Sequence, residues 1–181
     1  MDKVDSVIPQ ALLIPADLFG RIQKNVPIVC VDLVIIRQKP AGIEVLLIKR
    51  KLVIGFGKWC LIGGRVLKGE TLAQAVGRQA RRELGISVAF VPPWHANSPV
   101  WVSDEPDADP QKHSICMVYL VVIDSGVPAA SGPEFSESRW FKIEELPENI
   151  GFNHRHEIEV TLKALARIMD KHYGQFLKHE G

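Results

Sequence analysis

Residues 63–86 read GGRVLKGETLAQAVGRQARRELGI, and this segment sets the architecture expected for the whole chain. The glycine pair predicts a tight turn, and the spacing Thr71-x-x-Gln74 is typical of a capping box at a helix start. Gly85 stands where helices commonly end. The segment therefore predicts a glycine-rich turn followed by one amphipathic helix. The buried stripe of that helix follows helical spacing and consists of Leu72, Ala75, Val76, Ala80 and Leu84.

One acidic residue faces the same side of this helix as the apolar stripe. At about 100° per residue in an α-helix, Glu83 projects into or beside that stripe. Gln79 lies one turn earlier on the same side, and Arg78 and Arg82 flank it. A carboxylate that faces inward needs a cation nearby, because an unpaired buried charge is strongly disfavoured. The sequence therefore predicts that an arginine or a metal ion neutralises Glu83.

Strand patterns surround the turn and helix. Residues 28–36 and 45–50 are rich in β-branched and aliphatic side chains, and they predict an antiparallel pair. Residues 86–91 and 113–123 also predict strands, and Asn153 can cap a final helix. This order is typical of an α/β (α+β) fold, with a mixed sheet covered by helices on both faces in a single domain.

Length, composition and charge favour one soluble domain. The chain has 181 residues, 46% of them hydrophobic, and a formal net charge of +1, which is ordinary for a well-cored domain. This charge gives no general reason to expect binding to nucleic acid or to a membrane surface. The first residues lack the pattern of a signal peptide. We therefore expect a cytoplasmic protein with reduced, buried thiols at Cys30, Cys60 and Cys116.

Several charged residues are placed to serve a diphosphate and a metal ion. A glycine pair lets the backbone approach a ligand and leaves a carbonyl free to face a cation. Glu83 and a loop carboxylate such as Glu134 would complete an all-oxygen site suited to Mg²⁺. Arg50, Arg65 and Arg78 could neutralise a diphosphate, because guanidinium groups bind phosphate bidentately. The pattern predicts a metal-assisted reaction beside a diphosphate, with a purely structural helix as the alternative.

Asp32 is the anomaly of the first strand. A lone carboxylate among buried positions is costly unless it is paired or bound to something. Two interpretations stay open at this point: a hydrogen-bonded structural aspartate, and a contact to the substrate.

The glycine turn and helix resemble a known motif, the Nudix box, which has the form G-x5-E-x7-R-E-U-x-E-E-x-G-U with U aliphatic. Its framework positions are matched by Gly64, Glu70, Arg78, Glu83, Gly85 and Ile86. Two acidic positions differ, because Gln79 and Arg82 stand where the family normally has glutamates. The resemblance implies a Nudix fold over residues 25–181, preceded by an N-terminal arm at residues 1–24.

Loss of acids at those two positions is shared with the GDP-mannose mannosyl hydrolase branch of the Nudix superfamily. Similarity to that branch extends along most of the chain. It implies Mg²⁺-dependent hydrolysis of a nucleotide sugar such as GDP-mannose at the anomeric carbon, releasing a nucleoside diphosphate and free sugar. Mn²⁺ is the alternative ion.

The same likeness assigns roles by position. The metal ligands that it implies are the Gly63 carbonyl, Glu83 and Glu134. The catalytic residues that it implies are Arg50, Arg65, Arg78 and Glu70. The substrate-binding residues that it implies are Asp32, Arg50, Arg65 and Phe19.

The general base is not identified by this likeness. Phe135 occupies the loop position at which that branch has its base histidine, and phenylalanine cannot accept a proton. The alternatives are His154, His156, Glu137 and the acidic segment 103–112. Two further functions therefore stay open: a Nudix pyrophosphatase that cleaves the diphosphate itself, and a catalytically silent module that binds nucleotides.

Phe19 belongs to the N-terminal arm, which we expect to reach across a homodimer. Deleting residues 1–24 should then lower the mass measured by light scattering in solution from that of a dimer to that of a monomer. A dimer that survives the deletion would contradict this assignment.

Overall fold

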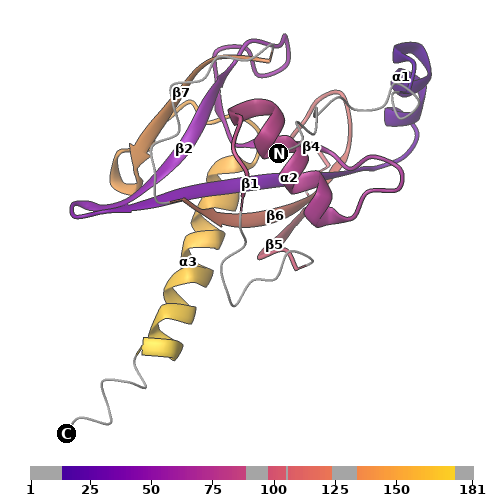
Figure 1. The fold of residues 1–181 in the computed structure, drawn as a ribbon. Coiled ribbons are helices and arrows are strands. Elements are labelled where there is room, and N and C mark those ends of the chain that lie inside the picture. The colour runs from indigo at the N-terminus through magenta and orange to yellow at the C-terminus, as the bar shows by residue number, and fades with distance from the viewer. Residues whose placement is uncertain (1–13, 89–97, 105, 124–133, 174–181) are drawn as a thin grey trace, which may run out of the picture.

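The structure is a computed structural model, and it describes all residues except 1–13, 89–97, 105, 124–133 and 174–181 (Figure 1). In chain order the elements are α1 (Ala16–Gln23), β1 (Ile28–Lys39), β2 (Gly42–Arg50), β3 (Trp59–Cys60), β4 (Ile62–Arg65), α2 (Leu72–Leu84), β5 (Trp101–Asp104), β6 (Ser114–Val122), β7 (Phe135–Lys142), the 3₁₀ helix η2 (Ile143–Glu145) and α3 (His154–Tyr173). None of the helices in these residues is long and apolar enough to cross a membrane.

The strands of the described residues form one seven-stranded mixed sheet. Its main path runs β3-β2-β1-β6-β5, while β4 pairs with β1 and β7 pairs with β2. β1 and β6 are parallel, and the other pairs are antiparallel. The predicted antiparallel pair of the first two strands is confirmed. So is the mixed sheet with helices on both faces, because Figure 1 shows α2 and α3 on opposite sides of it.

Two apolar layers hold the helices to the sheet, because successive side chains of a strand point to opposite faces. Val31, Leu33 and Ile35 of β1 belong to the layer that packs against α2. Val34 and Ile36 belong to the layer that packs against α3. By the same alternation Asp32 lies on the α3 face, where a polar side chain interrupts the apolar row.

One edge of β1 is shared in turn by two strands. Because β6 occupies one edge along its length, β2 and β4 must both use the other. β2 pairs with residues 36–39 of β1, and β4 pairs with residues 30–33. β2 therefore pairs with only the C-terminal part of β1, from Ile36 onward, and β4 pairs with the N-terminal part. The C-terminal end of β2 is thus separated from β1 near Asp32.

The predicted ends of α2 are confirmed. The Thr71 hydroxyl accepts a hydrogen bond from the Gln74 N–H at 3.2 Å, and the Gln74 side chain accepts one from the Thr71 N–H at 2.8 Å. Gly85 ends the helix in the left-handed conformation with φ of 68°, which suits glycine.

Two strand boundaries differ from the sequence-based prediction. Residues 86–88 form no strand, and the rest of the predicted strand at 86–91 lies outside the described residues. Ile86 and Val88 alternate because they pack on the core beneath α2, not because they join a ladder. Ser103 and Asp104 belong to β5 instead of an acidic loop, because they pair with β6.

Candidate functional site

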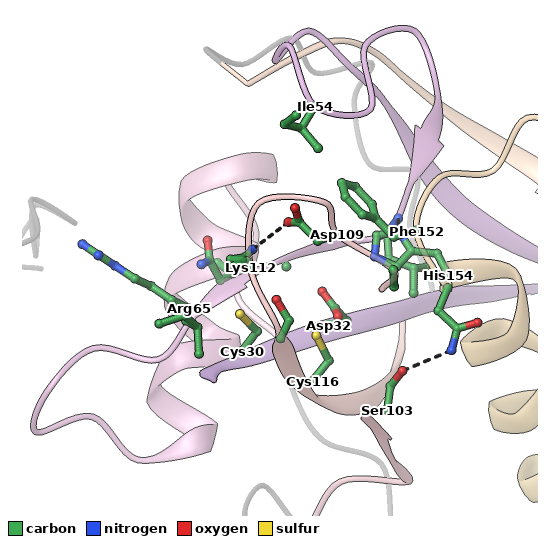
Figure 2. A pocket seen from close by; sticks show the side chains of 18 of the residues that line it. Cys30, Asp32, Ile54, Arg65, Ser103, Asp109, Lys112, Cys116, Phe152 and His154 are labelled. Carbon is green, nitrogen blue, oxygen red and sulfur yellow. Dashed lines mark hydrogen bonds and ion pairs between the residues drawn. The ribbon is translucent and has the colours of Figure 1, made fainter. Parts of the chain in front are cut away.

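A cavity of about 350 Å³ opens where β2 and β4 separate along β1. Figure 2 shows Asp32 and Cys116 near the middle of this cavity, with Phe152 and His154 on one side and Arg65 on the other. The predicted site residues that line it are Phe19, Asp32, Arg50, Gly63, Arg65, Arg78 and Glu134. The fold thus brings together residues from α1, β1, β2, β4 and α2 and from the start of β7.

Gly63 and Asp32 lie directly opposite each other in the β1–β4 ladder. A Cβ atom at Gly63 would clash with Asp32 Oδ1 and with the Val31 carbonyl oxygen, so only glycine permits this approach. In an antiparallel ladder, hydrogen-bonded and non-bonded pairs alternate. The Val66 N–H bonds the Val29 carbonyl at 2.9 Å, which makes Asp32 and Gly63 a non-bonded pair. The Gly63 carbonyl therefore points away from β1.

Two arginines on the cavity wall keep donors available for an anion. The Arg50 Nε–H donates to the Ile54 carbonyl at 2.7 Å, and its guanidinium lies 5.4 Å from the Phe152 ring centroid. Arg65 stacks on Phe19 of α1, 4.4 Å from the ring centroid. No acidic partner of either arginine occurs among the described residues. Their terminal N–H groups can therefore bind phosphate oxygens.

Arg78 lines the cavity and forms an ion pair with Glu70, which lies behind it. Arg78 Nε and Nη2 donate to the two Glu70 carboxylate oxygens at 2.5 and 2.9 Å, and Nη2 also donates to the Arg65 carbonyl at 2.9 Å. Burial alone would raise the pKa of Glu70, but these bonds and one from the Leu67 N–H lower it below its ordinary value. Glu70 faces Arg78 and the glycine turn, so it positions the wall and does not border the cavity.

Glu83 is buried and paired with an arginine, one of the two cations that the sequence allows. Arg82 Nε donates to Glu83 Oε1 at 2.8 Å, and Arg82 Nη2 donates to Glu134. Burial raises the pKa of Glu83, as does the Glu134 charge, while Arg82 and Arg50 oppose this. Glu83 Oε2 is buried and has no hydrogen-bond partner among the described residues.

Glu83 Oε2, which has no hydrogen-bond partner among the described residues, could ligate a divalent cation beside α2. Glu134 approaches the same arginine as Glu83, and α2 packs beside β4, which carries the outward-facing Gly63 carbonyl. Two carboxylates and a carbonyl are the oxygen donors that Mg²⁺ prefers. Arg82 occupies the space between the two glutamates, so a metal ion has to share their carboxylates with it or displace it.

A second polar cluster forms the floor of the cavity. Asp32 of β1 and His154 and Glu157 of α3 place ligand atoms within 4.8 Å of one another. All three residues are buried and line the cavity. This arrangement of a histidine and two carboxylates is the kind of group that can hold a metal ion.

The hydrogen bonding of His154 argues against that role in this conformation. The Leu61 N–H donates to His154 Nδ1 at 2.9 Å, so Nδ1 carries no proton. Burial lowers the pKa of His154, and Arg50 and Lys112 lower it further, although the Asp32 charge opposes this. The ring is therefore neutral with its proton on Nε2, and a protonated Nε2 donates a hydrogen bond and cannot ligate a metal.

Glu157 shares its surroundings with a second carboxylate. Burial and the Asp32 charge raise the pKa of Glu157 to about 8, against an ordinary 4.5, although a hydrogen bond donated by the Ser103 hydroxyl opposes the shift. Glu157 Oε2 has no hydrogen-bond partner in the described part of the chain. At neutral pH the floor therefore holds a protonated Glu157 beside Asp32.

The structure shows which of the candidate general bases lie at the cavity. Phe135 is fully buried in the core. His156 is exposed and meets the Trp101 ring edge, and Glu137 pairs with Arg139 at the surface. Only His154 of the two histidines lines the cavity. Sequence reasoning missed Glu157, although its spacing three residues after His154 places both on one helix face.

Three comparisons with known proteins bear on this geometry. A family model described as NUDIX domain matches residues 27–160. The chain is 34% identical over 128 residues to the ADP-ribose pyrophosphatase of Methanocaldococcus jannaschii, covering 71% of this chain and 69% of that one. It is 30% identical over 113 residues to the nucleoside triphosphatase NudI of Klebsiella pneumoniae, covering 60% and 78%.

A solved structure of a NUDIX hydrolase is also similar to this chain. The MutT NUDIX hydrolase from Burkholderia pseudomallei is 31% identical and superposes with a TM-score of 0.63, covering 75% of this chain and 98% of that one. The chain therefore belongs to the Nudix family of hydrolases, and its mixed sheet between helices is the Nudix fold.

The raised pKa of Glu157 predicts a pH-dependent stability. Between pH 4.5 and about 8 the folded chain keeps a proton that the unfolded chain releases. The free energy of unfolding should therefore fall as pH rises through this window, with a slope that approaches about 1.4 kcal/mol per pH unit. Glu157→Gln should remove this contribution, because an amide mimics the protonated acid. Urea unfolding across the window measures the slope.

The matched control is Glu159→Gln, which changes an exposed glutamate on the same helix. This variant should keep the slope of the unaltered protein. Equal slopes for Glu157→Gln and the unaltered protein would show that Glu157 holds no such proton.

Proposed function

We propose that this Nudix protein is a Mg²⁺-dependent hydrolase of a nucleotide sugar such as GDP-mannose, acting at the anomeric carbon. The observation that carries the proposal is the division of one cavity into two chemical zones. Arg50 and Arg65 line its wall, while buried acids and a histidine form its floor. A nucleotide sugar has two matching parts: an anionic diphosphate suited to the arginine wall and a hydroxyl-rich sugar suited to the polar floor.

The wall supports binding of the diphosphate. Arg50 and Arg65 present terminal N–H groups in fork geometry, which matches paired phosphate oxygens. Arg78, held by Glu70, fixes the backbone of Arg65 through its carbonyl. Mg²⁺ or Mn²⁺, bound by the Gly63 carbonyl, Glu83 and Glu134, would neutralise the charge that develops on a diphosphate leaving group.

The polar cavity floor supports attack at the anomeric carbon, because it offers a carboxylate, Asp32, as the general base that Phe135 cannot provide. In this proposal Asp32 accepts the proton of a water molecule while the oxygen of that water bonds to the anomeric carbon. The bond from that carbon to the phosphate oxygen breaks, and the diphosphate leaves with the electron pair. The neutral His154 and the protonated Glu157 lie beside Asp32 and can offer hydrogen bonds to sugar hydroxyls.

A pyrophosphatase that cleaves the diphosphate is the second candidate. One comparison favours it, because the M. jannaschii relative is named an ADP-ribose pyrophosphatase. ADP-ribose is also a nucleoside diphosphate joined to a sugar, so the same cavity suits both reactions. The two candidates differ in the atom that water attacks.

We also propose that the protein works as a homodimer in the cytoplasm, with the arm at residues 1–24 at the dimer interface. Ile14 and Leu18, in and beside α1, are exposed apolar side chains, and α1 buries none of its residues within the chain. The three cysteines are free thiols, which suits a reducing compartment.

Reaction of GDP-mannose with Mg²⁺ in ¹⁸O-labelled water tests the proposed function. We expect GDP and mannose as products, with ¹⁸O in the mannose, because water attacks carbon. Labelled GMP or mannose 1-phosphate would establish the pyrophosphatase instead. Binding without turnover over a panel of nucleoside diphosphate derivatives would establish a silent module.

The same assay tests Asp32. Asp32→Asn should lower kcat by about a hundredfold or more, the range for loss of a general base. Asp104→Asn changes an exposed aspartate that pairs with His113 outside the cavity floor, and it should leave kcat unchanged. A native melting temperature for both variants excludes unfolding as the cause.

A further inference from the structure

Arg82 holds two carboxylates at once at the edge of the cavity. Its Nε donates to Glu83 Oε1 at 2.8 Å and its Nη2 donates to Glu134. These glutamates come from α2 and from the residue before β7, so within the described residues Arg82 links two separate segments. Glu83 and Glu134 are also the two carboxylates of the proposed metal site. The arginine thus supplies the positive charge that a metal ion would bring.

Arg82 also reverses the charge expected at its position in the motif. It occupies a position of the Nudix box that normally carries a glutamate, so a negative charge is replaced by a positive one. A guanidinium and a divalent cation repel each other, and both compete for the same oxygens. With Arg82 in place, Glu83 Oε2 still has no hydrogen-bond partner among the described residues.

Arg82 also lines the same cavity as the phosphate-binding wall. Its side chain is 34% exposed and Glu134 is 35% exposed, whereas Glu83 is only 4% exposed. An exposed guanidinium can turn toward a diphosphate in the cavity without disturbing the core. Phosphate gives it a bidentate partner of higher charge than a carboxylate. If Arg82 leaves, the buried carboxylate of Glu83 loses its ion-pair partner, a state that favours binding of a cation.

We propose that Arg82 is a substrate-binding residue that exchanges Glu83 and Glu134 for the diphosphate of the substrate, so that the metal ion binds tightly only with the nucleotide. This inference rests on the proposed function for its ligand class. The coupling is reciprocal by linkage: the nucleotide strengthens metal binding as much as the metal strengthens nucleotide binding. Before substrate arrives, Arg82 keeps the acids neutralised.

Replacing Arg82 should change two affinities in opposite directions. In Arg82→Gln, Mn²⁺ alone should bind about tenfold tighter than in the unaltered protein, because the competing cation is gone. GDP or ADP without metal, in the presence of a chelator, should bind about tenfold more weakly, because a phosphate contact is lost. Titration calorimetry and the electron paramagnetic resonance signal of free Mn²⁺ measure these values without any turnover. A merely structural arginine would weaken both affinities together.

Two further variants locate the effect. Arg81→Gln removes the adjacent exposed arginine of α2 and should leave both affinities unchanged. Adding Glu83→Gln to Arg82→Gln should abolish the gain in Mn²⁺ affinity. If Arg82→Gln does not fold, Arg82→Lys replaces it; lysine cannot bridge two glutamates in fork geometry, so Mn²⁺ should again bind more tightly.

The inference is overturned if the Arg82 variant binds Mn²⁺ no better than the unaltered protein, or binds metal-free GDP and ADP equally well. The proposed function fails separately, if the unaltered protein binds neither nucleotide with or without metal.

Discussion

The close approach of β1 and β4 at Asp32 and Gly63 is the contact on which the functional part of this molecule depends. It requires glycine at position 63, because any side chain would collide with Asp32 and the β1 backbone. It also turns the Gly63 carbonyl outward, starts the chain toward α2, and lets β2 move away from β1. The cavity, its acidic floor and its arginine wall all follow from that separation.

The charges around this cavity form a balanced set. The four glutamates around it are each neutralised: Glu70 has Arg78, Glu83 and Glu134 share Arg82, and Glu157 keeps a proton beside Asp32. A buried carboxylate is tolerated only under such conditions. The balance around Arg82 can change when a diphosphate enters, while the pair of Glu70 and Arg78 fixes the wall and stays as it is.

Local chemistry made the helix and strand pattern, and the motif residues that line the cavity, predictable from the sequence. The capping box at Thr71, the end of α2 at Gly85 and the β-branched run of β1 are each encoded within a few residues. The floor was not predictable, because Asp32 and His154 meet only through folding, across more than a hundred positions. The alternation of Ile86 and Val88 wrongly predicted a strand, because burial produces the same pattern with or without a strand partner. The sequence allowed an arginine or a metal beside Glu83, and only the fold shows that Arg82 also reaches Glu134.

A crystal structure of the protein with Mn²⁺ and GDP is the most direct test of the proposed metal and diphosphate sites. We expect an anomalous peak for a Mn²⁺ ion bound by the Gly63 carbonyl, Glu83 and Glu134. The diphosphate should lie against Arg50 and Arg65, with its terminal phosphate directed toward Asp32. A nucleotide bound outside this cavity, or Mn²⁺ held by Asp32, His154 and Glu157, would contradict it.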